Sequence, residues 1–575
     1  MRRRSPEIRK VAVPFRTTRR AHENGLLARS SLLAAQLAAA YFITSVAIWA
    51  QQPALTPDSE PPRIEGRIFN IVSGEPVHRA TVTLTDVVQQ GSPRAVSSDG
   101  SGRFLFENLK RGTYRLSAER TGFLRQEYGG RPASLVGASL SLSPGQSMTG
   151  LVLRLTPQGA ITGKVLDEEG EASPSTNVIV LRQTGFGNSR RLTKIDWVVT
   201  NDLGEFRIPG LSPGRYFLAA DGRDSSGHVG EAGEDYVPSF YPGTTDPAAA
   251  AAIQVEAGQT ISGTNIPLRR SRVYHLRGRV LAGTASGTLR SIQVTLLPKR
   301  QEEVMMGLAQ MTGMATVEGA FEFRGVQPGS YYLVAIRTEG QAQILGRMPI
   351  EVAGSNLEDV VFAIGDRLDL AGSVRVEGER AVALKGVVLS LLPSDGLPMV
   401  PPNAAVSENG VFRLTGVSRD SYRLNLAGLP EGTYVKSVRL SGQEALDKGL
   451  DLRQARSAPA LEITLGAKAG AVEGLVRGDG KTLPASVILV PEPIRPNQPF
   501  LYKQASTDSD GRFTMSGLAP GDYKLYAFEE EADITLYIDS EWAKPLETGG
   551  DKVTISENCR EKIELKLISQ AETGR

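Results

Sequence analysis

The sequence has very few of the residues that build disulfides and metal centres. Its 575 residues include one cysteine, Cys559, and four histidines. A single cysteine excludes an intramolecular disulfide, so the folded domains must be held together by the packing of their cores. We expect Cys559, in the segment ISENCREKIELKL near the end of the chain, to be a passive strand or turn residue.

Long helical patterns are also scarce. After residue 50 no segment shows the period of a long amphipathic helix, whereas the 61 glycines and 34 prolines suit many short strands joined by turns. A chain of this length is too long for a single core, so several domains are expected.

Beyond the N-terminus there is no large excess of charge of either sign. Residues 1–30 hold nine Lys/Arg and two Asp/Glu, and residues 31–50 hold none, which leaves 56 basic and 61 acidic residues for the rest. A polyanion-binding protein would carry a basic surface, so nucleic acid is not an expected partner.

One long apolar run stands behind this basic N-terminal region, at Leu32–Ala50. This layout is typical of a secretory signal within 1–50, with cleavage after Ala50 and a linker at 51–62. The run is also long enough for an uncleaved membrane anchor, and a buried helix is the third alternative. In the first two cases the remainder is exported to the periplasm, the outer membrane or the extracellular space. Membrane contact is then expected only through an uncleaved segment.

One sequence pattern recurs five times along the rest of the chain. Each copy has a turn, an alternating strand with aromatic or aliphatic residues two apart, an apolar anchor, a second turn and the pattern Tyr-x-Leu. Alternation with period two predicts a strand with one buried face. Pro-Gly in three copies predicts a type II turn, whereas the fourth copy departs with Arg419-Asp420. The copies are 98–120, 200–220, 316–336, 407–427 and 507–530, and the whole domains that contain them are called the first to fifth repeats below.

A glycine after an apolar strand start precedes each copy. These glycines are spaced by 97, 115, 94 and 102 residues, and they are Gly66, Gly163, Gly278, Gly372 and Gly474. A period near 100 residues fits one small β-sandwich per repeat rather than a solenoid. The predicted domains are 63–158, 159–272, 273–367, 368–468 and 469–570.

The order G-x-V, alternating strand, D-G-x-F-x-F-x-x-L-x-P-G-x-Y-x-L resembles the carboxypeptidase regulatory-like domain, and the resemblance covers Arg63–Leu567. It implies a transthyretin-like, Ig-like β-sandwich in each copy. The predicted fold class is therefore all-β, with five tandem β-sandwich domains after an N-terminal export helix. Family members accompany metallocarboxypeptidases, extend outer-membrane receptors or form arrays in exported bacterial proteins, and this chain is similar to the last group.

No catalytic centre is expected, because the repeats leave no room for a peptidase domain and no G-x-S-x-G motif is present. We expect no cofactor and no metal site. Trp197 and Trp542 are expected to be half-buried strand residues rather than ligand platforms.

The best binding candidate is the segment EDYVPSFYPGTTDP at Glu234–Pro247. Sugar sites combine aromatic faces with carboxylates and amides, and the segment offers Asp235, Tyr236, Phe240 and Tyr241, with Asp246 nearby. The alternative is a packing role for the loop, because the first repeat has Tyr128 at the corresponding place.

We therefore expect a non-catalytic, exported cell-envelope protein that binds carbohydrate, with a polysaccharide or an envelope protein as its partner. Two alternatives are a structural spacer or adhesin that presents a protein-binding face, and an accessory subunit of an envelope enzyme or transporter system.

Overall fold

The structure is a computed structural model of the whole chain, with two compact units at Met1–Glu60 and Pro61–Arg575. It describes residues 62–568, except for short gaps. The predicted export segment and Trp542 lie outside the described residues. None of the helices described could cross a membrane, since each is too short. The gaps are 88–91, 131–136, 144, 185–190, 223–232, 283–291, 309, 340–341, 366, 379–382, 397–400, 456–458, 479–480, 483–484, 509, 529–537 and 539–548.

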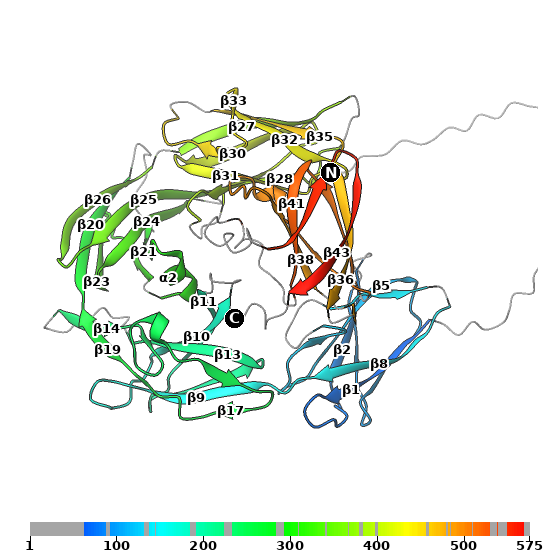
Figure 1. Cartoon of the computed structure of the whole chain (residues 1–575). Helices are drawn as coiled ribbons and strands as arrows, with labels where there is room; N and C mark the ends of the chain where they lie inside the picture. The colour runs from blue at the N-terminus through cyan, green and yellow to red at the C-terminus, as the bar shows by residue number, and fades with distance from the viewer. Residues whose placement is uncertain are drawn as a thin grey trace, which may run out of the picture. The chain divides into compact units, whose positions relative to one another are not determined.

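Strands make up nearly all of the described regular structure, as the predicted all-β class requires (Figure 1). The helical exceptions among the described residues are one short α-helix, α2 (Gln301–Met306), and two 3-10 turns, η1 (Pro247–Ala249) and η2 (Pro499–Leu501).

The first repeat folds into two sheets whose apolar faces meet. One sheet has the order β4-β1-β8 and the other β3-β2-β5-β6, with β7 also paired to β5. Side chains of both sheets, among them Ile64, Val82, Phe104 and Leu116, form one buried cluster, which makes the pair a sandwich. The strands are β1 (Ile64–Asn70), β2 (Thr81–Asp86), β3 (Arg94–Ser97), β4 (Arg103–Phe106), β5 (Gly112–Glu119), β6 (Gln126–Glu127), β7 (Leu140–Leu142) and β8 (Met148–Leu155).

The second repeat follows the same plan with sheets β12-β9-β17 and β11-β10-β13-β15. β18 also pairs with β9, β16 pairs with β13, and β14 forms a separate ribbon with β19. The strands are β9 (Gly159–Leu166), β10 (Asn177–Thr184), β11 (Arg191–Val199), β12 (Glu205–Leu211), β13 (Gly214–Asp221), β14 (Glu234–Val237), β15 (Ser239–Phe240), β16 (Ile253–Val255), β17 (Thr260–Ile261), β18 (Ile266–Pro267) and β19 (Arg269–Arg272).

The third and fourth repeats also form paired sheets. Their orders are β23-β20-β26 with β22-β21-β24-β25, and β30-β27-β35-β32-β33 with β29-β28-β31-β34. The strands are β20 (Tyr274–Ala282), β21 (Ile292–Pro298), β22 (Met311–Met314), β23 (Ala320–Val326), β24 (Gly329–Glu339), β25 (Ala342–Val352), β26 (Leu357–Ile364), β27 (Arg367–Val376), β28 (Val388–Pro393), β29 (Asn403–Ala405), β30 (Val411–Ser418), β31 (Ser421–Ala427), β32 (Tyr434–Leu440), β33 (Gln443–Glu444), β34 (Leu450–Asp451) and β35 (Ala460–Gly466).

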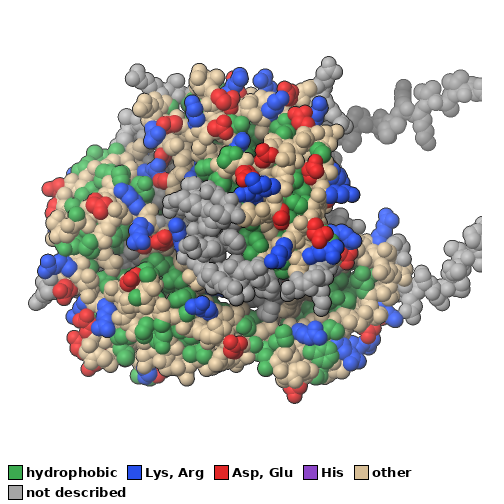
Figure 2. All heavy atoms as spheres, viewed as in Figure 1, with side chains coloured by type: hydrophobic (Ala, Val, Ile, Leu, Met, Phe, Trp, Pro, Cys, Tyr) green, Lys and Arg blue, Asp and Glu red, His purple; other side chains and the backbone are tan. Residues whose placement is uncertain are grey.

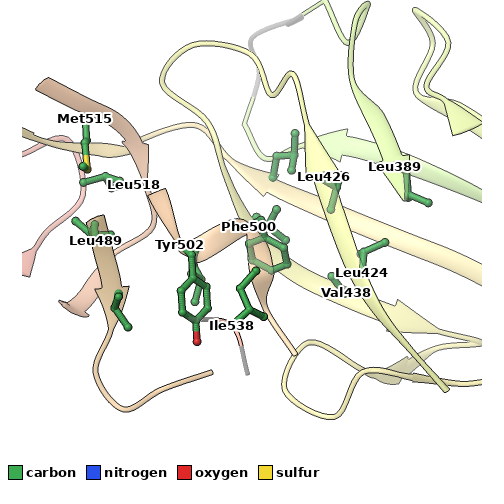
Figure 3. Packing of buried hydrophobic residues seen from close by; sticks show 14 of the residues in the cluster. Leu389, Leu424, Leu426, Val438, Leu489, Phe500, Tyr502, Met515, Leu518 and Ile538 are labelled. Carbon is green, nitrogen blue, oxygen red and sulfur yellow. The ribbon is translucent and has the colours of Figure 1, made fainter. Parts of the chain in front are cut away.

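In the fifth repeat the two layers join into one sheet because β43 pairs with both β36 and β41. Its buried side chains continue those of the fourth repeat in one hydrophobic cluster, which Figure 3 shows between Leu424 and Phe500. The strands are β36 (Gly470–Gly478), β37 (Lys481–Thr482), β38 (Ser486–Pro491), β39 (Lys503–Ser506), β40 (Arg512–Leu518), β41 (Gly521–Phe528), β42 (Asp551–Ile555) and β43 (Arg560–Ile568).

Some strands bury more than alternation predicts. The Phe-x-Phe strand β4 alternates between buried and accessible residues, as expected. In contrast β10 buries Val178, Ile179, Val180 and Leu181 in a row. Its second face is covered by side chains of α2, including Met306, so both faces of this sheet are apolar.

Candidate functional site

The predicted binding segment begins in the ribbon β14–β19. β14 pairs antiparallel with β19, which places Tyr236 opposite Arg270 and Asp235 opposite Ser271. β19 reads Arg-Arg-Ser-Arg and all four residues are exposed, which is typical of an edge ribbon facing water.

The ring of Tyr236 is already engaged by a side chain of the protein. The guanidinium carbon of Arg270 lies 4.6 Å from the ring centroid, and Arg270 Nη2 donates a hydrogen bond of 3.1 Å to the Tyr236 hydroxyl. The proximity of the Tyr236 phenol raises the pKa of Arg270, so the guanidinium stays charged and the cation–π contact persists. Tyr236 also packs against the main core of the second repeat.

Phe240 does not reach the surface. It is 2% exposed and packs in a hydrophobic cluster with Ile179, Leu181 and Phe217. A ring in that position packs in the core of the second repeat rather than on an open surface.

Tyr241 and Asp235 face in different directions from Phe240. Tyr241 is partly buried against the main core of the second repeat. The Asp235 carboxylate lies against β23, where a Cβ added to Gly325 would be 2.8 Å from its Oδ2. The four predicted residues therefore do not line one open surface, and their role in binding stays a prediction.

A hollow of about 550 Å³ opens elsewhere in the second repeat. It lies over the pairing of β9 with β12, and its polar lining comes from Thr162, Lys164, Asn201, Glu205, Arg207 and Asn265. Sequence reasoning missed this site. Lys164 is the feature of the sequence that could have indicated it, because no other repeat has a lysine directly after its repeat glycine. The residues at the other four positions are Arg67, Arg279, Ser373 and Leu475.

The hollow lies where the chain that pairs with β9 bulges between two short strands, and the Thr264 N–H still donates to the Thr162 carbonyl at 3.2 Å within the bulge. β17 and β18 both pair in parallel with β9, and residues 262–265 bulge out between them. The Asn265 side chain closes part of the gap, because its Oδ1 accepts a hydrogen bond of 3.1 Å from the Lys164 backbone N–H. A side-chain amide thus replaces a main-chain carbonyl of the ladder.

The charged groups of the hollow lie near its rim. Lys164 Nζ is 3.1 Å from Glu205 Oε1, and both side chains are nearly half exposed. The hydrogen bond from Lys164 lowers the pKa of Glu205, so the carboxylate stays ionised at neutral pH. An exposed pair of this kind contributes little to stability.

Side chains of the types that bind metal ions or act as nucleophiles do not gather at one place. Among the described residues no three His, Cys, Asp or Glu side chains are placed to hold a metal ion. A His and a Glu three residues apart are typical zinc ligands. The chain has this spacing once, at His228 and Glu231, but both lie outside the described residues. The Cys559 thiol donates to Glu561 Oε1 at 2.9 Å, and this contact raises its pKa, which disfavours the reactive thiolate.

Trp197 is more exposed than the sequence predicts. It lies on β11 at the edge of its sheet and is 51% exposed, and Lys194 Nζ is 5.6 Å from its ring centroid. Its backbone N–H is bonded to Asp196 Oδ1 at 2.8 Å, which blocks one position at which another strand could pair with this edge.

Paired sheets around buried clusters, one of which the fourth and fifth repeats share, define a tandem β-sandwich protein. The family model of the carboxypeptidase regulatory-like domain matches residues 63–156, which lie in the first repeat. No curated protein sequence matches the chain.

Several solved structures are similar at low identity. The TIE protein of Bacillus anthracis is 11% identical with a TM-score of 0.15, over 70% of this chain and 72% of that one. The minor pilin of Streptococcus agalactiae is 13% identical with a TM-score of 0.21, over 36% of this chain and 96% of that one. Two B repeats of the Staphylococcus aureus collagen-binding protein are 11% identical with a TM-score of 0.13, over 71% of this chain and all of the other.

Proposed function

We propose that the chain is a non-catalytic, exported spacer of the cell envelope, built from five tandem transthyretin-like domains with the boundaries predicted above. One observation carries the proposal. In every repeat the first strand has a strand from the end of the repeat as its parallel neighbour in the same sheet, as in β1 with β8 and β36 with β43; in the second repeat these are β17 and β18, and β19 follows them.

This arrangement resists pulling. The start of the first strand and the end of the last strand lie at opposite ends of a parallel ladder. A force on the two ends of a repeat therefore runs along the strands and across their hydrogen bonds. All bonds of the ladder are loaded together instead of opening one after another. A chain of such units keeps its length under tension.

The surface also suits a spacer. The outer sheets carry cross-strand ion pairs such as Glu65–Arg103 at 2.7 Å, and the face shown in Figure 2 mixes both charge signs. Interspersed charges keep an exported protein soluble without creating a strong field of one sign.

Single-molecule stretching of the exported chain tests the proposal. We expect separate unfolding steps, each releasing about 100 residues, or roughly 350 Å of extended chain. The fourth and fifth repeats share a cluster and are expected to unfold in close succession. Extension without resistance would contradict the proposal. N-terminal sequencing of the same material tests export, with Gln51 expected as the first residue.

Carbohydrate binding at the predicted loop is a second candidate, supported by the partial exposure of Tyr236 and Tyr241. A glycan and polysaccharide array tests it, beside a variant with both Tyr236→Ala and Tyr241→Ala. Binding that the variant loses would support this candidate, and the absence of any binding to a folded sample would remove it.

A further inference from the structure

The hollow of the second repeat differs from the corresponding place in the other repeats. The strand parallel to the first strand also bulges at the corresponding place in the first and third repeats, but it runs on there as one strand, β8 or β26, whereas here the bulge separates β17 from β18. The recess over this bulge has a volume of about 550 Å³, which is in the range of small-molecule sites.

Hydrogen-bond donors dominate the rim of this recess. Lys164 supplies an ammonium from β9 and Arg207 supplies an exposed guanidinium from β12. Asn265 uses its Oδ1 to accept from the Lys164 N–H, so its amide NH2 remains as a donor. Two cations and one amide donor face a single carboxylate, Glu205, which favours a ligand that itself carries a carboxylate.

The acceptors of the recess suit hydroxyl groups. Glu205 stays ionised beside Lys164, and it has lone pairs left beyond this ion pair and the hydrogen bond of 3.4 Å that Asn201 Nδ2 donates to its Oε2. Asn201 is occupied as a turn residue, because its Oδ1 accepts from the backbone N–H groups of Leu203 and Glu205 at 3.0 and 2.8 Å. It therefore holds Glu205 in place rather than adding a further acceptor.

We propose that this recess is a binding site for a uronic acid residue of an acidic polysaccharide. Lys164 and Arg207 bind the sugar carboxylate, the Asn265 amide donates to the sugar, and Glu205 accepts from a hydroxyl group. The site goes beyond the spacer function, because it gives one repeat a point of attachment to an anionic matrix.

The test is calorimetric titration of the exported full-length chain with oligogalacturonate. The methyl ester of the same oligomer serves as the neutral probe. We expect saturable binding of the acid form that weakens as salt is added, and no binding of the ester. Lys164→Gln is expected to weaken binding at least tenfold, whereas Lys164→Arg, which keeps the charge, retains most of it.

The first repeat supplies a matched control. Arg67 follows Gly66 as Lys164 follows Gly163, but it does not line the recess, so Arg67→Gln should bind like the unaltered chain. Equal affinity of the Lys164→Gln variant and the unaltered chain would overturn the proposal, as would equal binding of acid and ester. Absence of binding by a chain that still unfolds in steps under force would overturn this site alone and leave the spacer function intact.

Discussion

Gly66 of β1 and Phe104 of β4 are in direct contact at the centre of the first sandwich. A Cβ added to Gly66 would lie 2.6 Å from Cζ of Phe104 and 2.3 Å from the carbonyl oxygen of Leu151 on β8. Glycine here allows a ring from one neighbour and a backbone from the other to approach the same point. The other repeats contain the same pairing, as Gly163 with Phe206, Gly278 with Phe321, Gly372 with Phe412 and Gly474 with Phe513.

Replacing Gly66 by alanine should therefore destabilise the first repeat. The added methyl cannot be accommodated by a rotamer change alone, because one of its close contacts is backbone. We expect a loss of about 1–3 kcal/mol, the usual cost of overpacking. Hydrogen exchange of peptides that cover Ile64–Asn70 and Met148–Leu155 measures the loss, and Gly100→Ala is the control, since nothing lies within 4 Å of its Cβ position.

The sequence could predict the strands around Gly66 but not the reason for the glycine. Alternation of Phe104 and Phe106 predicted a buried strand face, and the five copies predicted several sandwiches. The partner Leu151 lies 85 residues from Gly66, and no local pattern indicates that two distant strands will pair in parallel.

The candidate site was harder to predict, because side chains of one loop can face opposite layers. Composition placed Phe240 with Tyr236 and Tyr241, yet Phe240 covers the second face of a sheet that α2 closes from another part of the chain. The recess at Lys164 depends on a strand interruption whose residues 262–265 look like an ordinary turn.

The tyrosine of the Tyr-x-Leu pattern stabilises the turn that precedes it. In the fifth repeat Tyr523 is 3% exposed, and its hydroxyl donates to the Ala519 carbonyl at 2.9 Å. Burial raises the pKa of Tyr523 to about 12, so it remains a donor throughout the neutral range. Tyr523→Phe should cost about 1 kcal/mol. Faster hydrogen exchange in Gly521–Phe528 would show this loss. The control is Tyr274→Phe, because the Tyr274 hydroxyl bonds to none of the described residues, and hydrogen exchange in its own strand, β20, should stay unchanged.

Asp420 explains why the fourth repeat departs from Pro-Gly. It lies 2.5 Å from Arg347 Nη2 of the third repeat, and Arg347 also pairs with Asp395. The side chains of Arg347 and Asp420 are 22% and 13% exposed, so this ion pair is partly buried. Asp420→Asn should lower the free energy of unfolding by about 1–2 kcal/mol. Calorimetry measures this loss. The control is Glu408→Gln, which removes an ion pair with Lys385 that is about 80% exposed and should leave the free energy of unfolding unchanged. Equal effects of the two variants would contradict the role of Asp420.

Glu322 should make the third repeat sensitive to acid. Hydrogen bonds from Arg324, and then from Arg277, lower its pKa to about 2. The unfolded chain titrates near its usual value, so the folded state binds the proton less tightly than the unfolded state. The stabilisation is present above about pH 4.5 and is lost as the pH falls toward about 2. Calorimetry across that range should show a smaller loss for Glu322→Gln than for Glu318→Gln; parallel losses would contradict the prediction.

The second repeat should be the first to unfold under tension, because its terminal ladder is the shortest. β1 pairs with β8 through six residues, whereas β9 meets β17 through two residues and β18 through two more. Fewer bonds loaded together fail at a lower force. In stretching experiments Ile208→Ala, which removes a fully buried side chain of this repeat, should weaken the step of lowest force. The matched lesion Phe106→Ala in the first repeat should weaken a different step. If Phe106→Ala weakens the lowest step and Ile208→Ala a stronger one, the length of the terminal ladder does not set the order of unfolding.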